Sequence, residues 1–178
     1  MSFRPMTSCD FITRIPICPD NGLPMYKNFT VDERIELQEF IATSAFEKLK
    51  ALPPYLRSFA LEDHLNNTGT ALSFSLILGA FWYETDAFVK DPQAMTNLLN
   101  ETEPETLRAT PEARPYLKAI LAYALGYTGQ SEATKAKLAQ LREDPVTPEA
   151  LNLYLDAVEA CLVDFKQEAC HPDAPQPR

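Results

Sequence analysis

The chain has 178 residues, of which 46% are hydrophobic and 23% are charged, so it can form one domain with its own core. Sixteen Lys and Arg residues against twenty-five Asp and Glu residues give a net charge of -9. No run of basic residues interrupts this acidic balance, so we expect no direct nucleic-acid partner. The apolar stretch from Thr70 to Trp82 is too short to span a bilayer, so we expect no membrane partner either.

The N-terminal residues 1–28 predict an extended arm that packs on the domain, because they combine prolines with large apolar side chains that solvent would not favour. These residues are Pro5, Pro16, Pro19 and Pro24 with Phe11, Ile12, Ile15 and Ile17. No uninterrupted apolar block precedes the prolines, so the region does not resemble a signal peptide, and we expect a cytoplasmic protein. Residues 29–170 form the expected helical domain, and the proline-rich residues 171–178 are expected to be a disordered tail.

The first helix signals follow the arm directly. Thr30 and Glu33 form a capping box, and an apolar stripe with helical spacing then continues to Leu52. Pro53 ends this predicted helix. Pro54 can open a second helix over residues 54–65, which the turn at residues 66–69 closes.

Residues 70–82 predict the central helix of the domain, buried on most sides, because they carry no charge and few β-branched side chains. Ala71, Ser75 and Gly79 recur every fourth residue and form a ridge of small side chains. A neighbouring helix could approach closely along this ridge, or a ligand could enter there.

The remaining helices are marked by caps and prolines. A charged continuation of the central helix is expected over 84–91, followed by helices over 92–100, 110–125 and 131–142. The last helix is predicted to begin at Thr147 and to carry one apolar face as far as Phe165. We therefore predict an all-α, single-domain bundle of six to seven helices, arranged either as an ordinary bundle or as stacked helical hairpins.

A repeated phrase supports the hairpin alternative. The four residues Thr-Pro-Glu-Ala occur at 110–113 and again at 147–150, and each copy is followed by a Tyr-Leu pair. Tyr55 and Leu56 give a fainter third copy. Within this pattern, residues 117–145 resemble a single degenerate tetratricopeptide-type helical hairpin. The positions that match are Leu121, Ala122, Leu125, Gly129, Ala133 and Pro145.

The sequence departs from that family at two points, because the turn after Gly129 is one residue short and Lys137 stands where a large apolar residue is usual. The resemblance implies that the first helices of successive hairpins line a concave binding surface. Arg57, Lys118 and Asp156 occupy one shared position of the repeated phrase, just after the buried Leu, and are the predicted partner-binding residues.

The sequence carries no catalytic motif and predicts no metal site or cofactor. It contains no Walker, GxSxG or GxGxxG pattern, and neither His64 nor His171 has a second histidine at ligand spacing. We therefore expect a binding protein rather than an enzyme: a helical adaptor, chaperone or immunity-type protein whose partner is another protein or a peptide. The alternative is an enzyme or small-molecule sensor with a pocket beside the central helix, residues 70–83.

The four cysteines form two groups at opposite ends of the chain. Cys9 and Cys18 are nine residues apart, and so are Cys161 and Cys170. This spacing is unlike a zinc knuckle, and the sequence leaves open whether the cysteines are paired, metal-bound or free. We expect reduced thiols, and we expect the arm to dock on the last helix with at least one arm cysteine close to Cys161 or Cys170.

Overall fold

The computed structural model describes residues 14–172, and this part of the chain is all-α, as predicted. It contains no β-strand, only an isolated bridge between Ile17 and Pro24. None of its helices is long and apolar enough to cross a membrane. The α-helices are α1 (Val31–Phe40), α2 (Ser44–Leu49), α3 (Pro54–His64), α4 (Ala71–Tyr83), α5 (Thr85–Lys90), α6 (Pro92–Arg108), α7 (Arg114–Tyr127), α8 (Ser131–Glu143) and α9 (Asn152–Ala160), with short 3-10 helices at Glu149–Leu151 and Glu168–Cys170.

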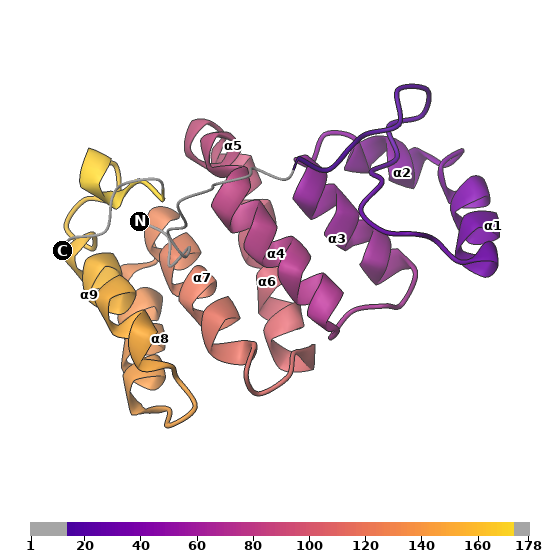
Figure 1. Ribbon diagram of the computed structural model, residues 1–178. Coiled ribbons are helices and arrows are strands. Elements are labelled where there is room, and N and C mark those ends of the chain that lie inside the picture. Colours follow the sequence, from indigo (N-terminus) through magenta and orange to yellow (C-terminus); the bar gives the residue numbers. More distant parts are fainter. Residues whose placement is uncertain (1–13, 173–178) are drawn as a thin grey trace.

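The helices are arranged in two rows. Helices α3, α4, α7 and α9 lie side by side and form the front row, and α6 and α8 lie behind them (Figure 1). Helices α1 and α2 lie at one end of the molecule and α9 lies at the other. Helices α4, α7 and α9 run in the same direction, whereas α3 runs the opposite way and packs on α4 as a hairpin. The faint third copy of the repeated phrase, on α3, therefore has a different setting from the copies on α7 and α9.

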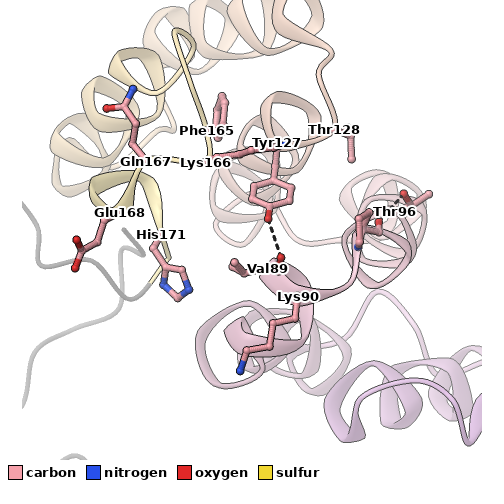
Figure 2. Close-up of a pocket in the computed structure, with 11 residues that line it drawn as sticks. Val89, Lys90, Thr96, Tyr127, Thr128, Phe165, Lys166, Gln167, Glu168 and His171 are labelled. Atoms are coloured by element: carbon pink, nitrogen blue, oxygen red, sulfur yellow. Dashed lines mark hydrogen bonds between the residues drawn. The ribbon is translucent and has the colours of Figure 1, made fainter.

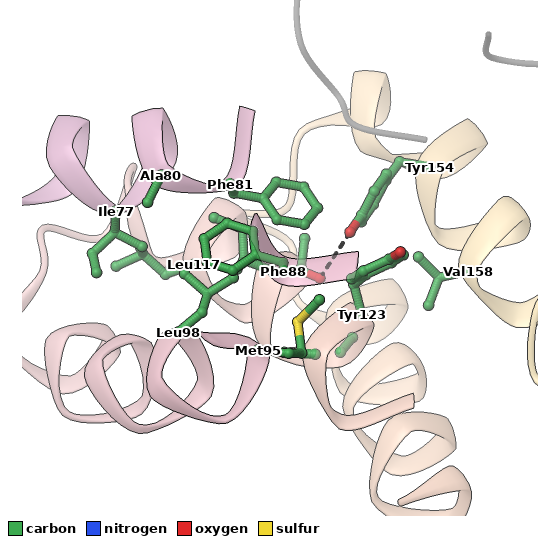
Figure 3. Packing of buried hydrophobic residues seen from close by; sticks show 14 of the residues in the cluster. Ile77, Ala80, Phe81, Phe88, Met95, Leu98, Leu117, Tyr123, Tyr154 and Val158 are labelled. Carbon is green, nitrogen blue, oxygen red and sulfur yellow. Dashed lines mark hydrogen bonds between the residues drawn. The ribbon is translucent and has the colours of Figure 1, made fainter. Parts of the chain in front are cut away.

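The main core surrounds α4, as the uncharged sequence of this helix predicts. Phe81 is fully buried and makes edge-to-face contacts with Tyr123 of α7 and Tyr154 of α9, at ring-centroid distances of 5.5 and 6.4 Å (Figure 3). The buried Tyr154 hydroxyl donates to the Ala119 carbonyl oxygen at 3.3 Å. Aromatic side chains, whose buried hydroxyls are hydrogen-bonded, therefore join α4, α7 and α9.

The described part of the N-terminal arm packs at the α1–α3 end of the molecule. Lys27 Nζ lies 2.7 Å from Glu33 of α1 and 2.6 Å from the buried Glu62 of α3. The hydrogen bond from Lys27 helps to lower the pKa of Glu33 to about 2. The Tyr26 hydroxyl also donates to Glu62, at 2.6 Å. This network holds the arm on α1 and α3, far from α9 (Figure 1).

Several predicted helix boundaries are wrong. The first predicted helix is two helices, α1 and α2, because the chain turns at residues 41–43 and Thr43 accepts a hydrogen bond from the Phe46 amide to cap the second. Helix α6 continues past residue 100 to Arg108, since Thr102, Glu105 and Thr106 are buried. The last helix ends at Ala160, before Phe165.

Two carboxylates cap the starts of helices other than their own. The fully buried Glu105 of α6 accepts hydrogen bonds from the Gly69 amide, at 3.1 Å, and from the Ser73 hydroxyl, at the start of α4. Glu84, which follows α4, accepts a hydrogen bond from the Tyr55 amide at 2.7 Å, in the first turn of α3. Each carboxylate satisfies donors that the helix itself leaves unpaired and lies at the positive end of the helix dipole.

The Glu105 cap provides a test of the α4–α6 contact. We expect Glu105→Ala to lower the free energy of unfolding by about 1–3 kcal/mol, because the Gly69 amide would lose its partner and the Ser73 hydroxyl would keep only the Thr70 carbonyl oxygen. Urea unfolding of the two proteins measures the difference. The matched control is Glu103→Ala, an exposed position on the same helix, which should change stability by less than about 0.5 kcal/mol. Equal effects of the two substitutions would contradict the role of Glu105.

The Glu84 cap provides a pH test. Burial raises the pKa of Glu84 from its ordinary value of 4.5 to about 7. Between these pH values the folded protein binds more protons than the unfolded chain, so stability should fall as the pH rises, by at most about 3 kcal/mol. Urea unfolding at pH 4.5 to 7.5 should show this decline in the native protein and a flatter curve in Glu84→Gln. Parallel curves for the two proteins would contradict the assignment.

Candidate functional site

A cavity of about 730 Å³ lies between the α5–α6 junction, the end of α7 and the C-terminal segment. Figure 2 shows the side chains that surround it. Aromatic and apolar groups from all three elements form its floor, and polar side chains form its edge. The lining residues are Val89, Lys90, Pro92 and Thr96 from the α5–α6 region, Tyr127 and Thr128 from α7, and Phe165, Lys166, Gln167, Glu168 and His171 from the C-terminal segment.

The α7 wall of the cavity is tied to α5. The Tyr127 hydroxyl donates to the Val89 carbonyl oxygen at 3.1 Å, which holds the ring against the cavity floor (Figure 2). Burial raises the pKa of Tyr127, so the hydroxyl remains protonated and continues to donate at neutral pH. The Thr96 and Thr128 hydroxyls donate to carbonyl oxygens of their own helices, so toward a ligand they can only accept.

The C-terminal wall is a loop closed by a disulfide between Cys161 and Cys170, whose Cα atoms are 5.8 Å apart. Within the loop, Phe165 contacts the Tyr123 ring edge-on at a centroid distance of 5.6 Å. The Tyr123 hydroxyl donates to the Cys170 carbonyl oxygen at 2.8 Å. In the chain-entropy model, closing a loop this short stabilises the fold by roughly 2–3 kcal/mol. The disulfide is therefore the strongest constraint on this wall.

The edge of the cavity is more basic than the protein as a whole. Lys90 pairs with Asp86 at 2.9 Å on the exposed surface of α5, and Lys90 and, to a smaller extent, His171 lower the pKa of Asp86. Exposed pairs of this kind contribute little, so Lys90 can exchange Asp86 for a ligand. Lys166 has no acidic partner within residues 14–172. In Figure 2 the acidic side chain of Glu168 points away from the other side chains that line the cavity.

A smaller cavity, of about 380 Å³, lies between α6, α7 and α8. Leu121 and Leu125 of α7 form its base, and Lys137 of α8 is at its edge. Lys137 is the position at which the sequence departs from the tetratricopeptide pattern. A long polar side chain there leaves a groove where a large apolar residue would have packed.

The three predicted partner-binding residues all have intramolecular partners and do not lie in either cavity. Arg57 donates to the carbonyl oxygens of Gly22, Lys50 and Leu52 and so fixes the arm and α2 against α3.

The other two predicted residues form ion pairs with α8 or the turn after it. Lys118 lies 3.1 Å from Asp144, and Asp156 lies 2.7 Å from Arg142. Asp156 remains largely exposed, whereas Lys118 is mostly buried. Because α3 and α9 lie at separate places along the front row (Figure 1), the three residues do not form one cluster.

The small-residue ridge of α4 is occupied at Gly79 by a neighbouring helix. A Cβ atom there would lie 2.2 Å from the Tyr55 ring of α3, so the absence of a side chain allows α3 and α4 to pack closely. Neither of the two cavities is lined by Ala71, Ser75 or Gly79.

The prediction of reduced thiols is wrong for Cys161 and Cys170 and agrees with Cys18. Cys161 and Cys170 are bonded to each other rather than reduced. Cys18 is a free, half-buried cysteine in the part of the arm that packs on α2 and α3, so that part does not dock on α9. Cys9 lies outside the described residues.

The sequence reasoning missed the cavity because its lining comes from three separate segments. One available signal was the nine-residue separation of Cys161 and Cys170 on either side of Phe165, which suits a short closed loop as well as two free thiols. His171 and Pro172, assigned to the tail, belong to the wall or lie buried beside it.

Within residues 14–172, no group of three or more His, Cys, Asp or Glu side chains is placed to hold a metal ion. Comparison of the chain with protein families, with curated proteins and with solved structures finds no match. The cavity offers an apolar surface for a side chain and lysines for a nearby negative charge.

The Phe165 contact gives a prediction whose sign depends on the background. A Cβ atom at Gly126 would lie 2.2 Å from the Phe165 ring. Gly126→Ala should therefore displace the ring and lower the free energy of unfolding by about 1–2 kcal/mol. In a Phe165→Ala background the clash is absent, and the same substitution should instead stabilise α7 by about 0.5–1 kcal/mol, because Ala favours a helix over Gly. An equal cost in both backgrounds, measured by urea unfolding, would contradict the contact.

Proposed function

We propose that this protein is a helical binding module that captures a protein or peptide, and that the cavity holds an acidic segment of the partner that carries an apolar side chain. The observation that carries the proposal is the combination of an aromatic floor, formed by Tyr127 and Phe165, with Lys90 and Lys166 at the edge. The cavity volume lies in the usual range for ligand sites. On a chain of net charge -9, most of the surface repels an acidic partner, so these lysines also direct it to the cavity.

The arrangement of the helices supports a peptide as the ligand. Helices α4, α7 and α9 run side by side in one direction with α6 and α8 behind them (Figure 1), which is the order expected of successive helical hairpins. The cavity lies where two of these hairpins and the C-terminal loop meet. Its edge residues Lys90, Pro92, Lys166 and Gln167 are exposed, so an extended chain can pass over the edge while one side chain enters.

Selection from a random peptide library tests the ligand class. We expect enriched peptides to contain Asp or Glu next to an aromatic or large aliphatic residue. The double variant Lys90→Glu, Lys166→Glu should weaken binding of these peptides by about tenfold to a hundredfold, because two attractive charges become repulsive. Fluorescence anisotropy with the enriched peptides measures the change.

Lys48→Glu is the matched control, because Lys48 is an exposed lysine on α2, at the opposite end of the molecule. It should leave peptide affinity unchanged. Failure to enrich any such peptide, or equal losses from the control and the double variant, would contradict the proposal. A small molecule retained through purification and seen by native mass spectrometry would instead favour the alternative of an enzyme or small-molecule sensor.

A further inference from the structure

We propose that the Cys161–Cys170 disulfide controls the cavity, so that the oxidised protein presents a formed binding site and reduction releases its C-terminal wall. This inference rests on the proposed function, since it concerns the regulation of the same site. Four of the lining residues, Phe165 to Glu168, lie inside the loop that the disulfide closes, and His171 follows it directly.

The loop has few other attachments. Val163 is 89% exposed, and residues 166–169 are all exposed, so these parts of the loop bury little apolar surface. Apart from the disulfide, the described loop is held by the Phe165 ring, which packs on Tyr123 and against Gly126, by burial of Cys170, and by the hydrogen bond from the Tyr123 hydroxyl to the Cys170 carbonyl oxygen. A segment with so few buried contacts opens more readily than the core.

The two ends of the disulfide are held in different ways. Cys161 directly follows α9 and is buried, with Tyr154 and Val158 of the same helix also in the core. Cys170 is equally buried in the main core, but it lies in a 3-10 turn outside the long helices, where the sulfur bond and the hydrogen bond from the Tyr123 hydroxyl help to hold it. Breaking the sulfur bond would therefore leave α9 in place and free the segment that carries Phe165 and Lys166.

The chemistry is a two-electron exchange with a dithiol reductant. A thiolate of the reductant attacks one of the two sulfur atoms and forms a mixed disulfide, and the other cysteine sulfur leaves and takes up a proton. The second reductant thiol then displaces the protein sulfur, which gives two cysteine thiols and one oxidised dithiol. Both protein sulfurs lie in buried residues, so exchange follows local opening of the loop, and a ligand that holds the wall in place should slow it.

This behaviour would matter most in a cytoplasmic protein, the location predicted from the sequence. Disulfides persist in oxidising compartments, whereas those of cytosolic proteins are usually transient and respond to redox conditions. Cys18, the free cysteine of the described chain, is half-buried in the turn of the arm that Arg57 holds against α3, so it is not placed to exchange with this disulfide.

The experiment compares oxidised protein, protein reduced with dithiothreitol, and the variant Cys161→Ser, Cys170→Ser. The probe is 8-anilinonaphthalene-1-sulfonate, an aromatic anion that matches the apolar floor and lysine edge, and its affinity is measured by fluorescence titration. We expect reduction and the double variant each to weaken binding about tenfold, because the wall is no longer pre-organised. Hydrogen exchange of residues 162–172 should accelerate while exchange in α4 and α7 stays slow.

Cys18→Ser is the matched control and should leave both the affinity and its redox dependence unchanged. The variant Lys90→Glu, Lys166→Glu reports whether the dye occupies the cavity. If the oxidised protein binds neither this dye nor acidic peptides in a lysine-dependent way, the proposed function fails. If binding is lysine-dependent but equal in the oxidised and reduced proteins, only the redox inference is overturned. Loss of the near-UV circular dichroism of the whole protein on reduction would also overturn it, because the bond would then support the entire fold.

Discussion

The packing of Tyr123 links the core of this protein to its cavity. Its fully buried ring contacts Phe81 of the central helix on one side and Phe165 of the C-terminal loop on the other, at centroid distances of 5.5 and 5.6 Å. Its hydroxyl donates a hydrogen bond to the Cys170 carbonyl oxygen. Its ring also stacks on that of Tyr127, which lines the cavity. Because protein interiors are closely packed, a change at Tyr123 would affect α4, α7 and the C-terminal wall of the cavity together.

Buried carboxylates give the helices their relative positions. A hydrophobic core favours close contact but specifies orientation weakly, whereas Glu105 and Glu84 must meet particular amide groups at helix starts. Each connects the start of one helix to a side chain of a neighbouring helix, α6 to the start of α4 and the end of α4 to the start of α3. Lys27 and Glu62 do the same for the arm. These polar contacts fix which helices are neighbours, and the aromatic core stabilises the result.

The division between a rigid array and a lightly attached wall suits a binding protein. Helices α4, α7 and α9 share one core, and Tyr127 of the cavity floor packs against it. The C-terminal wall depends mainly on a covalent bond and one aromatic side chain. A ligand can therefore meet a pre-formed apolar surface and still require a movable segment for complete contact.

The sequence by itself determined the helical class, the central uncharged helix and most helix starts, because these depend on local signals: periodicity, caps and first-turn prolines. The sequence also indicated the turn before α4, where Gly69 has a φ of 76°. It did not determine where α6 and α9 end, since burial of Glu105 against α4 and closure of the loop at Cys161 are contacts between distant segments.

Only the tertiary structure decided the partners of the polar and sulfur-containing residues. Arg57, Lys118 and Asp156 share one position in the sequence pattern, but their surroundings differ because α3 runs opposite to α7 and α9. The pairing of Cys161 with Cys170 and the assembly of the cavity from three segments likewise depend on how the helices pack. Periodicity shows which face of a helix is buried, but it does not show which neighbour covers that face, and here the neighbour determines the site.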